Sequence, residues 1–293
     1  MKKTIYLVIV LAFCFSILNS REITIEKNYG DNILECSIKN NNLLSIDFSL
    51  KSYEIEDVQK NGLEFKKLSV PNEGVTLEKG LPELPKIARL IGIENEGNPY
   101  VNLISYEKEV IKNITVFPNQ TTAFEEKSDF DIDNEFYSNG KIYPKEIVRI
   151  GKPAILRDYR VASLIIYPFQ YDPIKKELTI YSNIEFEILY NFEEETINPK
   201  QGNRPVSKAF ESIYSSSILN YDIVNNNRSG EYQKPCLLII RRAAIDESWI
   251  SDFINWKHRK GFEVVSVTAE TSIEVRDYIQ LAYDTWDNPP EYI

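Results

Sequence analysis

Hydrophobic and polar residues alternate in short runs between residues 21 and 190. Alternation with a period of two predicts strands that bury one face, and the polar residues between the runs predict turns. The expected turns are residues 40–42 and the pair 182–183. The expected strands lie within 23–26, 34–50, 101–104, 113–116, 160–167, 177–181 and 184–188. Because this stretch shows no helical period, residues 21–190 are predicted to form an all-β, sandwich-like domain.

Residues 191–234 have the composition of a linker. Residues 193–195 are three glutamates, and Asn, Ser and Gly accumulate toward residue 230. One helix is predicted at 207–219, with Ser207 as its N-cap. Its apolar face would consist of Ala209, Phe210, Ile213, Tyr214 and Ile218. Because such a face needs a partner surface, part of the linker is expected to be docked.

From residue 235 the pattern becomes strand, helix, strand, helix, strand. Continuous apolar runs predict buried strands, and apolar residues three and four positions apart predict helices. The expected elements are strand 237–240, helix 245–260, strand 262–267, helix 272–285 and a third strand that begins at 291–293. Apolar strands linked by helices predict an α/β unit with a parallel sheet. Residues 235–293 are expected to be the truncated, incomplete beginning of such a domain.

The helix predicted at 245–260 has one apolar side. This side would bury a stripe of Trp249, Ile250, Phe253, Ile254 and Trp256. Gly261 follows directly and is expected to adopt the left-handed conformation that ends many helices. Tyr292 and Ile293 are expected to be buried in the third strand.

The first 20 residues have the pattern of a secretory signal peptide. Lys2 and Lys3 precede an apolar run at 5–18, and Ser20 marks the expected cleavage position. The run is short for a membrane span, and an uncleaved anchor is the alternative. We therefore expect a secreted or cell-surface protein that does not remain in the membrane after removal of the signal.

Charge and motifs limit the partners. The formal charge is -10, with 34 Lys and Arg against 44 Asp and Glu, and no basic face is concentrated in the sequence. This balance argues against a nucleic-acid partner. The D-F-D-I-D run at 129–133 resembles the opening of a calcium loop, but Asn134 and Gly140 occupy the positions of the required Gly and Glu. We therefore expect no metal and no cofactor.

Few residues suit nucleophilic or metal chemistry. The single histidine, His258, lies near the end of a predicted helix among basic residues, which favours a surface role. Cys14 lies in the signal segment, which leaves Cys36 and Cys236. A disulfide between them is one alternative, and a buried structural role, best supported for Cys236, is the other. These residues predict neither a Cys-His pair nor a zinc site.

Two regions resemble the gingipain family of secreted bacterial cysteine endopeptidases. The sequence G-L-P-E-L-P at 80–85 is similar to the G-x-P-x-L-P signature of gingipain-type propeptides, and Y-P-F-Q-Y-D-P at 167–173 closes the same region. The runs L-L-I-I at 237–240, F-I-N-W-K at 253–257 and Y-I-Q at 278–280 are similar to the opening of the gingipain catalytic domain. Order and spacing agree over residues 60–293.

The resemblance implies a pro-domain followed by the start of a caspase-like α/β domain, whose activity depends on a Cys-His dyad. In this family the propeptide assists folding and blocks the active site until it is cleaved. His258, Cys36 and Cys236 do not match the motif positions of the dyad, so no residue here is expected to be catalytic. The chain alone is therefore expected to be inactive, with its own or a cognate peptidase domain as its partner.

The resemblance implies a processing site, and loop length leads to the hypothesis of an inhibitory site. Processing is expected after Arg228, which lies in a polar, Asn-rich stretch. Arg204 and Lys234 are weaker alternatives because each precedes a proline. Residues 125–141 form the longest loop expected in the β domain, and Lys141 is a candidate pseudo-substrate that would block the active site. A plain surface loop is the alternative.

The predicted function is therefore the N-terminal part of a gingipain-like cysteine endopeptidase zymogen. Its parts would be a signal peptide at 1–20, a pro-domain at 21–190, a linker at 191–234 and the start of the peptidase domain at 235–293. The alternative is a stand-alone secreted β-sandwich that binds a protease or a surface ligand.

Overall fold

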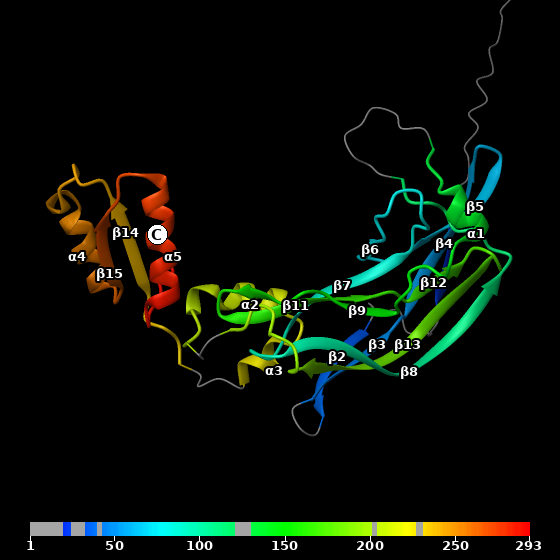
Figure 1. The fold of residues 1–293 in the computed structure, drawn as a ribbon, viewed down its shortest axis with the longest axis horizontal. Helices are drawn as coiled ribbons and strands as arrows, with labels where there is room; N and C mark the ends of the chain where they lie inside the picture. The colour runs from blue at the N-terminus through cyan, green and yellow to red at the C-terminus, as the bar shows by residue number, and fades with distance from the viewer. Residues whose placement is uncertain (1–19, 25–32, 40–42, 121–129, 201–203, 227–230) are drawn as a thin grey trace, which may run out of the picture.

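The computed structural model describes residues 20–24, 33–39, 43–120, 130–200, 204–226 and 231–293. These residues form an elongated arrangement with most strands at one end (Figure 1). The C-terminal part forms the other end, and short linker helices lie between the ends. The β domain, the linker and the C-terminal part therefore follow one another in space as they do in the chain.

The strand-rich end contains two antiparallel sheets that pack face to face (Figure 1). The first contains, in order, β10 (Ala154–Leu156), β11 (Tyr159–Ile166), β7 (Pro85–Gly92) and β6 (Gly74–Val75), with β9 (Val148–Ile150) also paired to β11. The second contains β12 (Phe169–Asp172), β13 (Glu177–Asn191), β3 (Leu43–Ser49) and β2 (Ile33–Lys39), with β8 (Asn98–Lys112) also paired to β13. A third sheet contains β1 (Ser20–Thr24), β4 (Ser52–Lys60) and β5 (Leu63–Ser69). The prediction of mainly antiparallel β structure is confirmed.

One hydrophobic core lies between the two large sheets. On β3 and β13, Ile46 lies opposite Phe186 and Phe48 lies opposite Ile184, and all four side chains are buried. Leu164 on β11 belongs to the same core from the other sheet. Each such side chain contributes roughly 1.5–3 kcal/mol through burial. The period of two in the sequence therefore identifies the inner faces of the sheets.

The turn predicted at 182–183 is wrong. β13 continues without a break, and its register with β8 shifts between Tyr181 and Asn183. The shift is a β-bulge, in which one strand gains an unpaired residue. On its other edge β13 pairs first with β12 and then, beyond the bulge, with β3. The two polar residues thus mark a change of partner strand and not a reversal of the chain. By contrast, Lys39 of β2 lies opposite Leu43 of β3, as expected for a hairpin around 40–42, which lie outside the described residues.

A short helix, α1 (Asn134–Asn139), occurs where the sequence predicted only a loop. The carboxylate of Asp133 accepts a hydrogen bond from the Phe136 N–H at 2.9 Å and so caps the helix. The Asp133 N–H donates to the Gly80 carbonyl at 3.0 Å, and the Tyr137 hydroxyl donates to the Val116 carbonyl at 2.7 Å. These bonds attach α1 to the β domain.

The helix predicted at 207–219 is divided into shorter pieces. A 3-10 turn, η1 (Lys208–Phe210), leads into α2 (Glu211–Ser217), and α3 (Tyr221–Asn226) follows. Tyr214 and Ile218 are buried as predicted, but Ile213 is 48% exposed. Ser207 does not cap with its side chain, because its hydroxyl donates to the Glu291 carboxylate instead. The buried residues pack against Tyr159 and Val161 of β11, so the linker is docked as expected.

The C-terminal part has the predicted order of elements. β14 (Cys236–Arg241) and β15 (Glu263–Thr268) pair in parallel. Between them lie η2 (Glu247–Ile250) and α4 (Ser251–Arg259), and α5 (Ser272–Thr285) follows β15. Gly261 adopts φ +88° after α4, as predicted. Tyr292 forms a parallel bridge with Leu237, which places a third strand position beside β14.

The buried stripe predicted for the helix at 245–260, which the structure forms as η2 and α4, is wrong. Trp249 is 75% exposed, and Phe253 and Trp256 are also exposed. Tyr292 and Ile293, expected to be buried, are 44% and 65% exposed. An apolar period predicts that one face of a helix will be covered, but it does not say by what. Within the described part of the chain, α4 packs on β15 and its aromatic face stays open to solvent.

Candidate functional site

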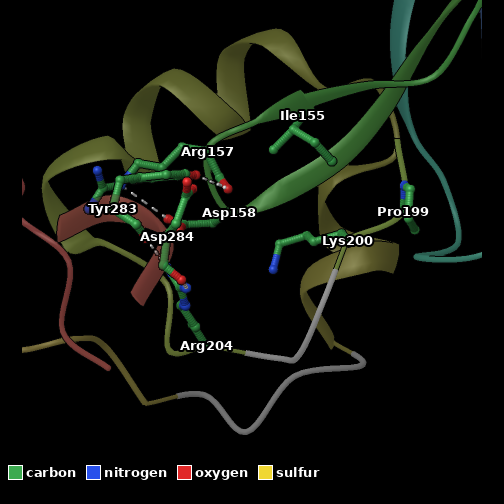
Figure 2. Close-up of a pocket in the computed structure, with 8 residues that line it drawn as sticks. All are labelled: Ile155, Arg157, Asp158, Pro199, Lys200, Arg204, Tyr283 and Asp284. Atoms are coloured by element: carbon green, nitrogen blue, oxygen red, sulfur yellow. Dashed lines mark hydrogen bonds and ion pairs between the residues drawn. The ribbon is translucent and has the colours of Figure 1, made fainter. Parts of the chain in front are cut away.

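The turn between β10 and β11 meets both the linker and the C-terminal part. Arg157 and Asp158 form this turn, and Arg157 adopts the left-handed conformation with φ +47°. Figure 2 shows their side chains next to Arg204, Tyr283 and Asp284. The Tyr283 hydroxyl of α5 donates to the Arg157 carbonyl at 2.7 Å. A single turn of the β domain therefore contacts two later parts of the chain.

Asp158 joins this turn to the linker. Its Oδ2 accepts hydrogen bonds from the Ser207 N–H at 3.0 Å and from the Tyr214 hydroxyl at 2.8 Å. Arg157 Nε lies 3.7 Å from the same oxygen. Burial, followed by the nearby Asp158 carboxylate, raises the pKa of Tyr214, so the hydroxyl remains a donor. A buried carboxylate with these partners fixes the position of η1 and α2.

Arg157 extends from the turn toward the C-terminal part. Its Nη1 donates to the Pro290 carbonyl at 3.1 Å, and its Nη2 donates to Gln233 Oε1 at 3.4 Å. The guanidinium lies 4.7 Å from the ring centroid of Phe210, within the range of a cation–π contact. The planar fork of arginine allows both hydrogen bonds and the stacking contact at once.

Arg204, one of the weaker processing candidates, binds the end of α5. Its Nη1 donates to the Tyr283 carbonyl at 2.6 Å and its Nη2 to the Asp284 carbonyl at 2.9 Å. Carbonyls at a helix C-terminus lack intrahelical partners and carry partial negative charge, so a cation there is stabilising. The structure thus gives Arg204 a role at the junction that the sequence did not indicate.

A cavity of about 290 Å³ lies beside these contacts (Figure 2). It is lined by Ile155, Arg157, Asp158, Pro199, Lys200, Arg204, Tyr283 and Asp284. Its lining comes from the β10–β11 turn, the linker and α5. The cavity is therefore part of the junction between these three parts and not a separate site.

The linker also docks on β7 through an amide pair. Asn220 Oδ1 accepts from the Gly92 N–H at 2.7 Å, and Asn220 Nδ2 donates to the Gly92 carbonyl at 2.9 Å. A Cβ atom at Gly92 would lie 2.9 Å from Val224 Cγ1, closer than van der Waals contact allows. Glycine at this position therefore permits the close approach of α3 to β7.

Arg160 anchors the beginning of the linker. It is 1% exposed, and burial lowers the pKa of its guanidinium, which nevertheless stays charged. Four backbone carbonyls accept its hydrogen bonds, at 2.7 to 2.9 Å: those of Glu94, Gly97, Ile197 and Asn198. Sequence reasoning missed both Arg160 and Asp158. The only signal was a charged residue at each of two positions that begin a strongly apolar strand.

Of the other predicted site residues, the structure describes Lys234 and Lys141. Arg228 lies outside the described residues. Lys234 is exposed and precedes β14. Lys141 is exposed and follows α1, whose last turn ends at Gly140. Among the three of these residues that the structure describes, Arg204 alone lines the cavity beside the β10–β11 turn.

His258 lies on the surface, and the two cysteines are structural residues, as the sequence favoured. His258 is exposed at the end of α4. Cys36 and Cys236 are free thiols, and Cys236 is fully buried. Burial raises the pKa of each thiol to about 11, which disfavours the reactive thiolate. The disulfide alternative is thus not formed.

Other chemistry is limited among the residues described here. No group of three or more His, Cys, Asp or Glu side chains in these ranges could hold a metal ion. Part of the D-F-D-I-D run lies outside the described residues. No helix in the described ranges is long and apolar enough to span a membrane. The predicted signal peptide lies almost entirely outside the described residues.

Comparison with known proteins identifies the family of the chain. The protein family model Propeptide_C25 matches residues 24–227, which include β2 to β13 and the docked linker helices but not β14 and β15. The chain belongs to this family. It contains a gingipain-type propeptide, as the motifs at 80–85 and 167–173 indicated.

Several gingipains are similar to the chain beyond the propeptide. Gingipain R1 from Porphyromonas gingivalis is 25% identical over 303 residues, a match that covers 97% of this chain and 29% of that protein. Gingipain R2 from the same species is 26% identical over 272 residues, covering 86% and 36%. Lys-gingipain HG66 is 25% identical over 262 residues, covering 84% and 15%. The chain thus spans between 15% and 36% of the length of these relatives.

Two solved structures share the fold of the gingipain propeptide. One is a complex of the Porphyromonas gingivalis RgpB pro- and mature domains, with a TM-score of 0.57 and 23% identity over 64% of this chain and 97% of that chain. The other concerns the zymogenic latency of gingipain K from the same species, with a TM-score of 0.50 and 25% identity over 59% and 98%. Each match covers almost the whole of the solved chain but only about three fifths of this one.

Proposed function

We propose that the chain is the N-terminal part of a secreted, gingipain-like cysteine endopeptidase zymogen. In this proposal residues 21–190 are the pro-domain, 191–234 the linker and 235–293 the beginning of a caspase-like peptidase domain. The single observation that carries it is the match of a propeptide family model to 24–227, directly before a parallel strand–helix–strand unit. The chain itself supplies no catalytic residue in this proposal.

The parallel pair β14–β15 supports the peptidase part of the proposal. A buried parallel sheet requires cover on both faces. Trp249 of η2 and the Phe253 and Trp256 side chains of α4 form an exposed aromatic face. It is an apolar surface of the kind that further peptidase structure would cover. The partner of the pro-domain is then the peptidase domain of the same precursor or a cognate one.

Processing is proposed after Arg228. Two alternatives are less suited to a protease: the Arg204 guanidinium is bound to the end of α5, and both Arg204 and Lys234 precede a proline. In the precursor, Arg228→Ala is expected to abolish the cut, because the basic side chain recognised by the protease is lost, whereas Arg204→Ala leaves it in place. N-terminal sequencing of the products measures this. A product that still begins at Ser229 in the Arg228→Ala variant contradicts the assignment.

Lys141 is proposed as the residue that blocks the peptidase active site. It is exposed and follows α1, which is fixed to the β domain through Asp133 and Tyr137. A side chain presented from a fixed base loses less entropy on binding than one on a free loop.

The inhibition test compares the chain with its Lys141→Ala variant. The unmodified chain is expected to slow peptide hydrolysis by the cognate peptidase, and Lys141→Ala is expected to weaken this inhibition by about tenfold or more, as for loss of one charged anchor. Lys152→Ala, which removes another exposed lysine, is the matched control. Equal inhibition by both variants refutes the role of Lys141. A chain that does not inhibit but binds a surface ligand would support the stand-alone binding module.

A further inference from the structure

The segment after α5 is held by side chains from earlier parts of the chain. Pro289 and Pro290 are buried. The Pro289 carbonyl accepts a hydrogen bond from Gln233 Nε2 at 3.2 Å, and the Pro290 carbonyl accepts one from Arg157 Nη1 at 3.1 Å. The Ser207 hydroxyl donates to the Glu291 carboxylate. We call Arg157, Ser207 and Gln233 the proline clamp.

The chemistry of the clamp matches the segment that it holds. Proline has no backbone N–H, so two adjacent prolines present carbonyl oxygens only and need donors when they are buried. The guanidinium of Arg157 and the amide of Gln233 supply these donors. A hydroxyl donor then faces the carboxylate of the next residue. The clamp therefore fits an extended Pro-Pro-acidic sequence.

Arg157 is also held by contacts other than those with the segment. Asp158 Oδ2 lies 3.7 Å from its Nε, and the ring of Phe210 lies under its guanidinium. Its Nη2 also donates to Gln233, so two clamp residues support each other. Preorganised donors lose less conformational entropy when they bind.

The residues that follow the prolines form the third strand position. The N–H groups of Glu291 and Tyr292 donate to the Cys236 carbonyl at 3.0 and 3.2 Å. The Leu238 N–H donates to the Tyr292 carbonyl at 2.9 Å. A shift by one residue would reverse the faces of the side chains. Register is normally fixed by burial, yet Tyr292 and Ile293 are both exposed here, so burial alone does not fix it.

We propose that the proline clamp is the site through which the pro-domain and linker set the register of residues 291–293 beside β14. Its ligand is the Pro289-Pro290-Glu291 sequence of the same chain. This proposal rests on the proposed function, in which 235–293 belongs to the peptidase. Arg157 is then a positioning residue for a strand that it does not itself join.

Hydrogen exchange on the full chain tests the proposal. Arg157→Ala is expected to speed amide exchange at Leu238 and Tyr292 by about tenfold or more, the equivalent of losing one or two hydrogen bonds. The amide of Gly92, which is bonded to Asn220, reports on linker docking and is expected to be unchanged. Arg149→Ala is the matched control, because Arg149 is exposed on β9 and stacks on Tyr167.

A second variant separates the clamp from a general loss of folding. Gln233→Ala removes the donor to Pro289 and is expected to give the same local pattern. Unchanged exchange at Tyr292 in both variants overturns the proposal. Equal acceleration at Gly92 and Tyr292 also overturns it, because Arg157 would then act on docking as a whole. Hydrogen exchange is measured without the peptidase. A chain that does not inhibit the peptidase but shows the expected exchange pattern would therefore refute the proposed function and leave the contacts of the clamp in place.

Discussion

Replacement of Arg160 by methionine is expected to lower the free energy of unfolding by about 4 kcal/mol. The guanidinium is buried and donates to four carbonyls, two from residues 94 and 97 and two from residues 197 and 198. Methionine fills similar volume but leaves these carbonyls without their donor, at about 1 kcal/mol each. Urea denaturation followed by circular dichroism measures the loss.

Two comparisons make this result specific. Arg149→Met removes an exposed arginine and is expected to change stability by less than about 0.5 kcal/mol. Arg160→Lys keeps the charge but has only three donors on a single nitrogen, so it is expected to cost roughly half as much as methionine. A methionine variant as stable as the unmodified protein would show that the four hydrogen bonds contribute little net stability.

Asp158→Ala is expected to cost about 3 kcal/mol and to detach the linker from β11. The substitution leaves the Ser207 N–H and the Tyr214 hydroxyl without an acceptor and removes the carboxylate next to Arg157. Losing one partner of a buried, hydrogen-bonded charge leaves the others desolvated and unpaired. Denaturation measures the stability, and the near-ultraviolet signal of the tyrosines around position 159 reports on linker packing.

The matched control for this substitution is Asp222→Ala on α3. Asp222 is exposed and carries the same charge, so its loss is expected to cost less than about 1 kcal/mol. Asp158→Asn keeps one acceptor oxygen and is expected to fall between the two. If Asp158→Ala and Asp222→Ala have the same effect, the junction is not organised around the Asp158 carboxylate.

Local periodicity predicted the elements of this protein better than it predicted their ends and partners. The parallel pair of β14 and β15, the helix α5 and the left-handed Gly261 all follow from the sequence. The bulge near Ser182 did not, because the same polar pair suits a hairpin turn and a strand that changes partners. A choice between these depends on β12 and β3, which are far away in the sequence.

The contacts at the junction between the β10–β11 turn, the linker and α5 were still harder to predict from the sequence. Arg157 and Asp158 lie in a turn and Arg204 lies in the linker, where charged residues are ordinarily exposed. Their roles come from contacts with Pro290, Tyr214 and Tyr283, which tertiary folding alone brings close. Tyr292 and the aromatic residues of α4 show the opposite error, because an apolar pattern predicts that a residue can be buried but not which surface buries it.

The residues of the proline clamp are synthesised before the segment that they bind. Arg157 and Ser207 precede Pro290 in the chain, Arg157 by 133 positions. Chains are synthesised from the N-terminus, and early domains fold before later ones emerge. Arg157 and Ser207 are thus synthesised before the two prolines. The side chains proposed to set the register of residues 291–293 can therefore be in position before this strand segment is synthesised.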